Sequence, residues 1–109
     1  MSEPTRKVTL RDERSGKDWR NLWAYVGPDG ALHIDGQDLG PSTAMMSSDG
    51  EYEWFKTIAA IHVPRLLTLL GGQPGDDILD VLASYTGEHS YELEKLLRES
   101  DIPVNFFSC

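Results

Sequence analysis

A strand that runs through a proline directly into an apolar helix is the strongest structural signal of this sequence, and it lies between Asp49 and Gly72. Residues Glu51–Ile61 are rich in aromatic and β-branched side chains, which favour a β-strand. Apolar groups fall on both alternating faces of this segment, so we expect a central strand that is covered on both sides over its second half. Pro64 predicts a helix that begins at Val63 or Pro64, because proline is tolerated at the first helical position.

The residues before this stretch predict further strands. The runs Leu22–Val26 and Ala31–Asp35 flank Gly27-Pro28-Asp29-Gly30, and two β-rich runs around a Gly/Pro loop indicate a hairpin. Val8 and Leu10 alternate with charged neighbours and favour a short strand over residues 6–12, followed by a polar loop over residues 13–18. Four strands are therefore expected before the first helix.

The residues after this stretch predict two more helices and a closing strand. Ile78, Leu79, Leu82 and Tyr85 fall on one helical face, with Asp76 or Gly75 as the expected cap. Ser90 is expected to cap the last helix, and residues 102–107 favour a returning strand. The prediction is an α+β fold in the order ββββαααβ, with three helices packed on one face of an antiparallel sheet of about four to five strands. We expect a single domain over residues 1–109, with residues 1–7 frayed.

Charge narrows the range of possible functions. The net charge is −8, and residues 21–109 hold four Lys/Arg against fourteen Asp/Glu. Such a domain repels nucleic acid and attracts basic proteins, although acidity also keeps a protein soluble. No apolar run approaches 18 residues, and the N-terminus has no apolar signal-peptide core. We therefore expect a cytoplasmic protein that binds neither nucleic acid nor a membrane directly.

The sequence contains no recognisable catalytic motif. Its three histidines are far apart, and its single cysteine, Cys109, ends the chain. A metal site at Asp76, Asp77 and Asp80 is one interpretation, but acids in the first turn of a helix are already explained by the helix dipole. Glu51 and Glu53 share a strand face, where they could act as an acid–base pair, anchor a partner's arginines or simply be solvated. We expect no catalytic residue, no metal and no cofactor.

Three segments carry a resemblance to a known group: DGALHIDGQDLG, DGEYEWFKTIAAIHVPRLLTLLGGQPGDDILDVL and YELEKLLRESDIPVNFFS. They resemble small actinobacterial-type immunity proteins of bacterial toxin systems, including contact-dependent growth inhibition. The resemblance implies an inhibitor that binds and neutralises a cognate toxin, and no catalytic residues carry over. A basic, nuclease-type toxin domain would suit the acidity of the chain.

The leading hypothesis is therefore an immunity protein that blocks the active or substrate-binding site of a basic toxin domain and is monomeric when free. The alternatives are a regulatory or adaptor module that binds another basic protein, and a small metal-dependent hydrolase. The predicted partner-binding residues form a first set and a second acidic surface. The first set is Asp35, Asp38, Asp49, Glu51, Glu53 and Trp54, and the second is Asp76, Asp77 and Asp80. Within the first set, Trp54 is a candidate aromatic anchor, although a core position is the commoner role for such a residue.

Overall fold

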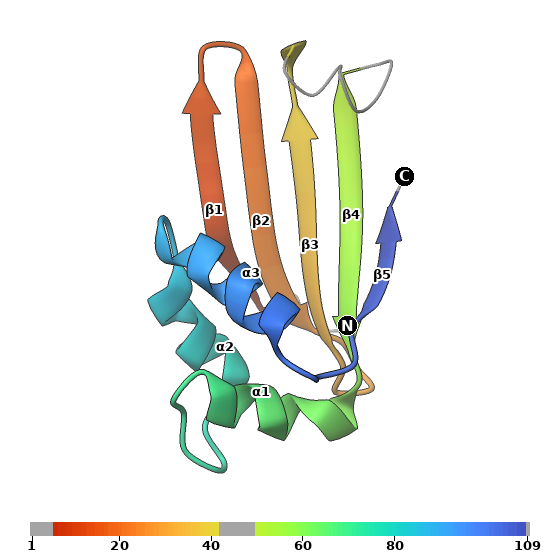
Figure 1. The fold of residues 1–109 in the computed structure, drawn as a ribbon, viewed down its shortest axis with the longest axis vertical. Coiled ribbons are helices and arrows are strands. Elements are labelled where there is room, and N and C mark those ends of the chain that lie inside the picture. Colours follow the sequence, from red (N-terminus) through yellow and green to blue (C-terminus); the bar gives the residue numbers. More distant parts are fainter. Residues whose placement is uncertain (1–5, 42–49, 109) are drawn as a thin grey trace, which may run out of the picture.

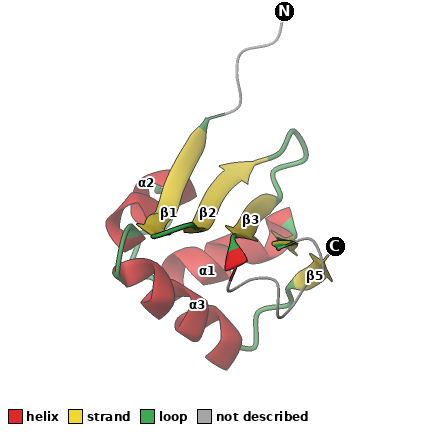
Figure 2. Cartoon of the chain, turned by 90° about the horizontal axis from the view of Figure 1, so that it is seen from above, coloured by secondary structure: helices red, strands yellow, loops and turns green. Residues whose placement is uncertain are grey.

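The chain folds into two layers, a five-stranded antiparallel sheet and a layer of helices on one of its faces (Figures 1 and 2). The computed structural model describes residues 6–41 and 50–108. The strands pair in chain order, β1-β2-β3-β4-β5. They are β1 (Lys7–Ser15), β2 (Asp18–Val26), β3 (Leu32–Leu39), β4 (Glu51–Ile58) and β5 (Asn105–Ser108). The helices are α1 (Val63–Leu69), α2 (Ile78–Leu82) and α3 (His89–Glu99), with 3₁₀ turns η2 (Ala60–His62) and η3 (Ala83–Tyr85).

This architecture confirms the predicted α+β fold and its order ββββαααβ. The hairpin around residues 27–30 is present, and Gly30 adopts the positive φ of 83° that its turn requires. The helix α1 begins at Val63 with Pro64 in its first turn, as expected. Strand β4 ends at Ile58 rather than Ile61, because residues 60–62 form the turn η2 instead.

Three of the early strands are longer than the sequence indicates. Strand β1 extends to Ser15 and β2 begins at Asp18, so the expected polar loop shrinks to a tight turn at Gly16 and Lys17. Strand β3 continues through Gly36 to Leu39. Residues 1–5, part of the segment expected to fray, lie outside the described residues, whereas Lys7 already begins β1.

The hydrophobic core lies between the sheet and the helices. On the sheet it is built from Leu22, Ala24, Leu32, Ile34, Trp54 and Ile58, and on the helices from Leu66, Leu67, Leu79, Leu82, Leu93 and Leu97. The described helices cover only this face. The prediction that the second half of β4 is covered on both sides is therefore wrong. Phe55 and Thr57, on its other face, remain partly exposed. The helices also stop short of the upper ends of the strands in Figure 1.

Helix capping differs from the sequence prediction at two positions. Asp77, rather than Asp76 or Gly75, caps α2, and its carboxylate accepts a hydrogen bond from the Leu79 N–H at 2.8 Å. Ser90 does not cap α3, because it lies inside the helix and is fully buried. Its hydroxyl instead donates to the Gly87 carbonyl at 2.6 Å.

A buried arginine joins α3 to the sheet. Arg11 on β1 is only 5% exposed; it donates from Nε to Ser90 Oγ at 3.0 Å and from a terminal nitrogen to Glu94 Oε1 at 2.5 Å. Its guanidinium also stacks on the ring of Tyr91, 3.7 Å from the ring centroid. Lys56 on β4 lies 3.8 Å from the other oxygen of Glu94. Glu94 therefore binds two strands of the sheet at once.

We predict that Glu94→Ala lowers the free energy of unfolding by about 3 kcal/mol, because it leaves the charge of Arg11 buried without its partner. Urea denaturation measures the loss. Glu99→Ala, on the exposed side of the same helix, should change the stability by less than about 0.5 kcal/mol. Equal losses from the two substitutions would contradict a structural role for the Arg11–Glu94 pair.

Gly36 is a second point at which packing depends on one residue. An added Cβ at Gly36 would lie 2.1 Å from the Trp54 ring, which packs across the glycine from β4. We predict that Gly36→Ala costs about 1–3 kcal/mol through overpacking. The cost should be smaller in a Trp54→Leu background, where the ring is gone. Denaturation of both single variants and the double variant tests this, and an unchanged cost in the two backgrounds would refute it.

Candidate protein-binding surfaces

The first set of predicted partner-binding residues is divided between the two faces of the sheet. Strand alternation and pairing place Asp35, Glu51 and Glu53 on the face away from the helices, and Asp38 and Trp54 on the helix side. Asp49 lies outside the described residues. The structure therefore brings together three of the predicted acids and separates them from the other two residues.

The face away from the helices, here called the open sheet face, carries most of the aromatic side chains of the sheet. Its aromatic residues are Trp19, Trp23, Tyr25, His33, Phe55 and Phe107. Sequence reasoning did not select these residues as a binding surface. Their signal was present, since residues 19, 21, 23 and 25 alternate with the core positions of β2, but which of the two faces stays uncovered depends on where the helices pack.

Side-chain contacts organise the open sheet face. Tyr25 and His33 stack with their ring centroids 4.7 Å apart, and Phe55 lies 6.0 Å from Phe107 across the β4–β5 pair. Phe107 is 63% exposed even so. A contiguous group of aromatic residues on a surface is typical of protein–protein interfaces, whereas single apolar residues are scattered over most protein surfaces.

Glu51 and Glu53 form a held carboxylate pair on this face. The amide nitrogen of Gln37 donates to Glu51 Oε1 at 2.9 Å and lies 3.4 Å from Glu53 Oε1. The hydrogen bond with Glu51, together with partial burial, raises the pKa of Glu53. Gln37 therefore holds the two carboxyl groups side by side on this face.

Asp35 lies between the aromatic residues of the neighbouring strands, opposite Trp23 on β2 and Phe55 on β4. It is only 5% exposed. Burial raises its pKa, against the opposing effects of a hydrogen bond from Tyr25 and the nearby His33. Within the described residues, its Oδ1 is buried without a hydrogen-bond partner. A buried carboxylate in this state costs folding free energy.

Trp54 and Asp38 have a different environment on the helix side. Trp54 is 8% exposed and belongs to the core, so it serves packing rather than presentation to solvent. Asp38 lines a small cleft of about 210 Å³ with Tyr52, Trp54, Lys56 and Phe106. Burial raises the pKa of Asp38, although Arg20 and Arg11 act in the opposite direction.

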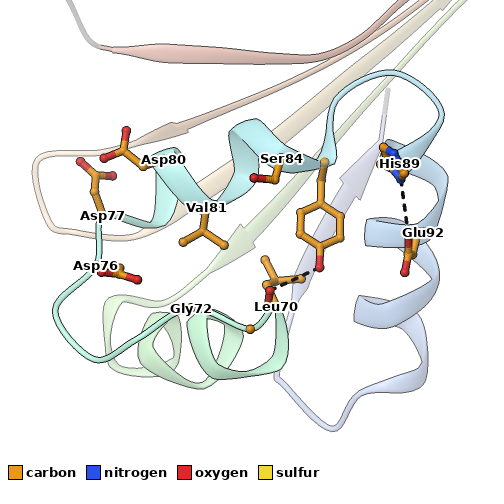
Figure 3. A pocket seen from close by; sticks show the side chains of 11 residues that line it. Leu70, Gly72, Asp76, Asp77, Asp80, Val81, Ser84, His89 and Glu92 are labelled. Atoms are coloured by element: carbon orange, nitrogen blue, oxygen red, sulfur yellow. Dashed lines mark hydrogen bonds and ion pairs between the residues drawn. The ribbon is translucent and has the colours of Figure 1, made fainter.

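The second predicted surface is an acidic groove beside the start of α2, shown in Figure 3. Asp76, Asp77 and Asp80 line it with Glu92 of α3, and its volume is about 630 Å³. Each aspartate already has an internal partner. Asp76 accepts from the Gln73 N–H at 2.8 Å, Asp77 caps α2, and Arg6 forms ion pairs with both Asp77 and Asp80.

Among residues 6–41 and 50–108, no three His, Cys, Asp or Glu side chains are grouped to hold a metal ion. Glu51 and Glu53 line neither the acidic groove nor the small cleft beside Asp38. None of the described helices has the length and apolar character needed to cross a membrane.

No protein-family model, curated protein or solved structure matches this chain. The surfaces are therefore interpreted from their own geometry and charge.

We predict that Asp35→Asn raises the free energy of unfolding at pH 7. The folded-state pKa of Asp35 lies above its ordinary value of 3.8, so ionisation favours the unfolded chain and stability is lost as pH rises through the folded pKa. The gain from Asn should therefore shrink as pH falls toward 4 and vanish below it. Denaturation curves at pH 3.5, 5 and 7 measure this, and a loss of stability at pH 7 would contradict it.

Proposed function

We propose that this chain is an immunity-type inhibitor that binds a basic toxin domain in the cytoplasm and blocks its active or substrate-binding site. The observation that carries the proposal is the open sheet face, an aromatic and acidic surface that none of the described helices covers. The resemblance of the sequence to small immunity proteins supports the same conclusion, as does the net charge of −8.

The physical basis of such inhibition is occlusion. A nuclease-type toxin domain binds its substrate through basic side chains, since phosphates dominate nucleic-acid affinity. An acidic surface complements these side chains, speeds the encounter of the two proteins and competes with the substrate for the same charges. The aromatic side chains supply buried contact area and lower the dissociation rate. Inhibition of this type needs no chemical step on the inhibitor.

The experiment that tests the proposal begins with capture of the tagged protein from a lysate of its own host, washed at low and at high salt. The retained protein is identified and expressed alone and together with this chain. We expect one basic partner whose expression alone stops growth and whose toxicity is relieved by co-expression. Higher ionic strength should weaken retention, because salt screens the attraction between opposite charges.

Two outcomes would contradict the proposal. A retained basic partner that is harmless when expressed alone would instead favour a regulatory or adaptor module. A toxic partner whose activity continues in the complex would show that binding does not block its site.

A further inference from the structure

The open sheet face consists of two halves that differ in their supply of positive charge. On the β1–β2 half, the chain provides its own cations. Lys7 Nζ lies 5.0 Å from the centroid of the Trp23 ring, and the guanidinium of Arg14 lies 4.2 Å from that of Trp19. Asp12 on this half also accepts a hydrogen bond from Trp19 Nε1 at 2.7 Å. Aromatic rings and charge are thus already complemented there.

The β3–β5 half has the same kinds of aromatic and acidic groups but a different charge balance. Strand pairing places ten residues of β3, β4 and β5 on this face, and none of these ten is a lysine or arginine. Three of them are acids: Asp35, Glu51 and Glu53. The paired rings of Phe55 and Phe107 lie next to Glu53, which is two residues from Phe55 along the same strand face.

Asp35 gives an independent indication that this half is incomplete. Its side chain is 95% buried at the centre of the face, and one carboxylate oxygen has no hydrogen-bond donor among the described residues. A buried acceptor without a donor is destabilising, so an acid at this position costs stability in the free protein. A cation bound beside Asp35 on this face would offset part of that cost through its charge, without touching the buried oxygen.

From these contacts we infer that the β3–β5 half of the open sheet face binds an arginine-bearing segment of a basic partner protein. The guanidinium stacks on Phe107 and Phe55 and pairs with the carboxylates of Glu51 and Glu53, as Lys7 and Arg14 already cap the rings of the β1–β2 half. The inference rests on the proposed function and specifies its contact surface.

The surface favours an arginine of a basic partner over other occupants. Arginine suits this surface better than lysine, because its planar guanidinium both stacks on an aromatic ring and makes two parallel hydrogen bonds to a carboxylate. A second copy of this chain is disfavoured, because two molecules that each carry a net charge of −8 repel one another. A basic partner is the complementary choice.

The test uses the isotope-labelled full chain and two synthetic peptides, hexa-arginine and hexa-lysine, titrated at low salt and followed by NMR. We expect hexa-arginine to shift the amide signals of Glu53, Phe55 and Phe107, and to bind at least several-fold more tightly than hexa-lysine. The spectrum also reports whether each variant is folded.

Matched variants assign the surface. Glu53→Gln and Phe107→Ala, both at partly or largely exposed positions, should each weaken hexa-arginine binding about 5- to 10-fold. Glu92→Gln removes one charge from the acidic groove and should leave the affinity within about 2-fold. Shifts centred on residues 76–80 and Glu92, equal effects of Glu53→Gln and Glu92→Gln, or equal binding of the two peptides would each overturn the inference.

Failure of this inference is distinguishable from failure of the proposed function. If a toxic partner is captured and neutralised but Glu53→Gln and Phe107→Ala do not weaken the complex, inhibition stands and this surface is wrong. If the peptide maps to this surface but the captured partner is harmless, the surface stands and the immunity role is wrong.

Discussion

The buried contact of Arg11 with Ser90 and Glu94 joins the last helix, α3, to the first strand of the sheet, and it lies on the face where Leu93 and Leu97 of α3 enter the core. Arg11 can make it only because β1 contains a bulge between Thr9 and Arg11. In a regular strand, Leu10 and Arg11 would point to opposite faces. The bulge shifts the alternation by one residue, so that both are buried, at 0% and 5% exposure. Residues beyond the bulge, such as Asp12, then join the open sheet face.

The described helices cover one face of the sheet and leave the other face uncovered. The helices bury the aliphatic side of the strands, and the uncovered side keeps aromatic rings, acids and one buried carboxylate that lowers stability. A surface optimised for stability alone would not retain Asp35 in this state, and costs of this kind are common where a surface serves binding. The uneven distribution of basic residues along the chain has a structural counterpart here, since Lys7 and Arg14 complement one half of the face and leave the other acidic.

The parts of the fold that depend on local chemistry could be predicted from the sequence. Pro64 sets the start of α1, and the Gly/Pro turn over residues 27–30 forms the hairpin, because both act through neighbouring residues. The bulge in β1 and the burial of Ser90 depend on contacts between residues far apart in the sequence. The local pattern therefore pointed to Ser90 as the cap of α3 instead of a buried residue. For Trp54 the sequence left both an aromatic anchor and a core position open, and the structure shows the core position, where the ring packs over Gly36.

The candidate site could be predicted only in part. The acids Asp35, Glu51 and Glu53 do share a face, whereas Asp38 is an odd number of residues from Asp35 and therefore lies on the opposite one. The same parity joins Trp23, Tyr25 and Phe55 to the acids once the strand register is known. The sequence does not reveal that register, because it follows from pairing between distant strands.

Both the proposed inhibition and the proposed arginine contact require that the partner binds the open sheet face rather than the helix layer. Hydroxyl-radical footprinting of the free chain and of its complex with the captured basic protein tests this most directly, because aromatic side chains that become buried lose labelling. We expect labelling to fall at Trp23, Tyr25, Phe55 and Phe107 and to stay unchanged at Tyr85 and Tyr91 on the helix side. Loss of labelling at Tyr85 and Tyr91, with the open sheet face unprotected, would contradict it.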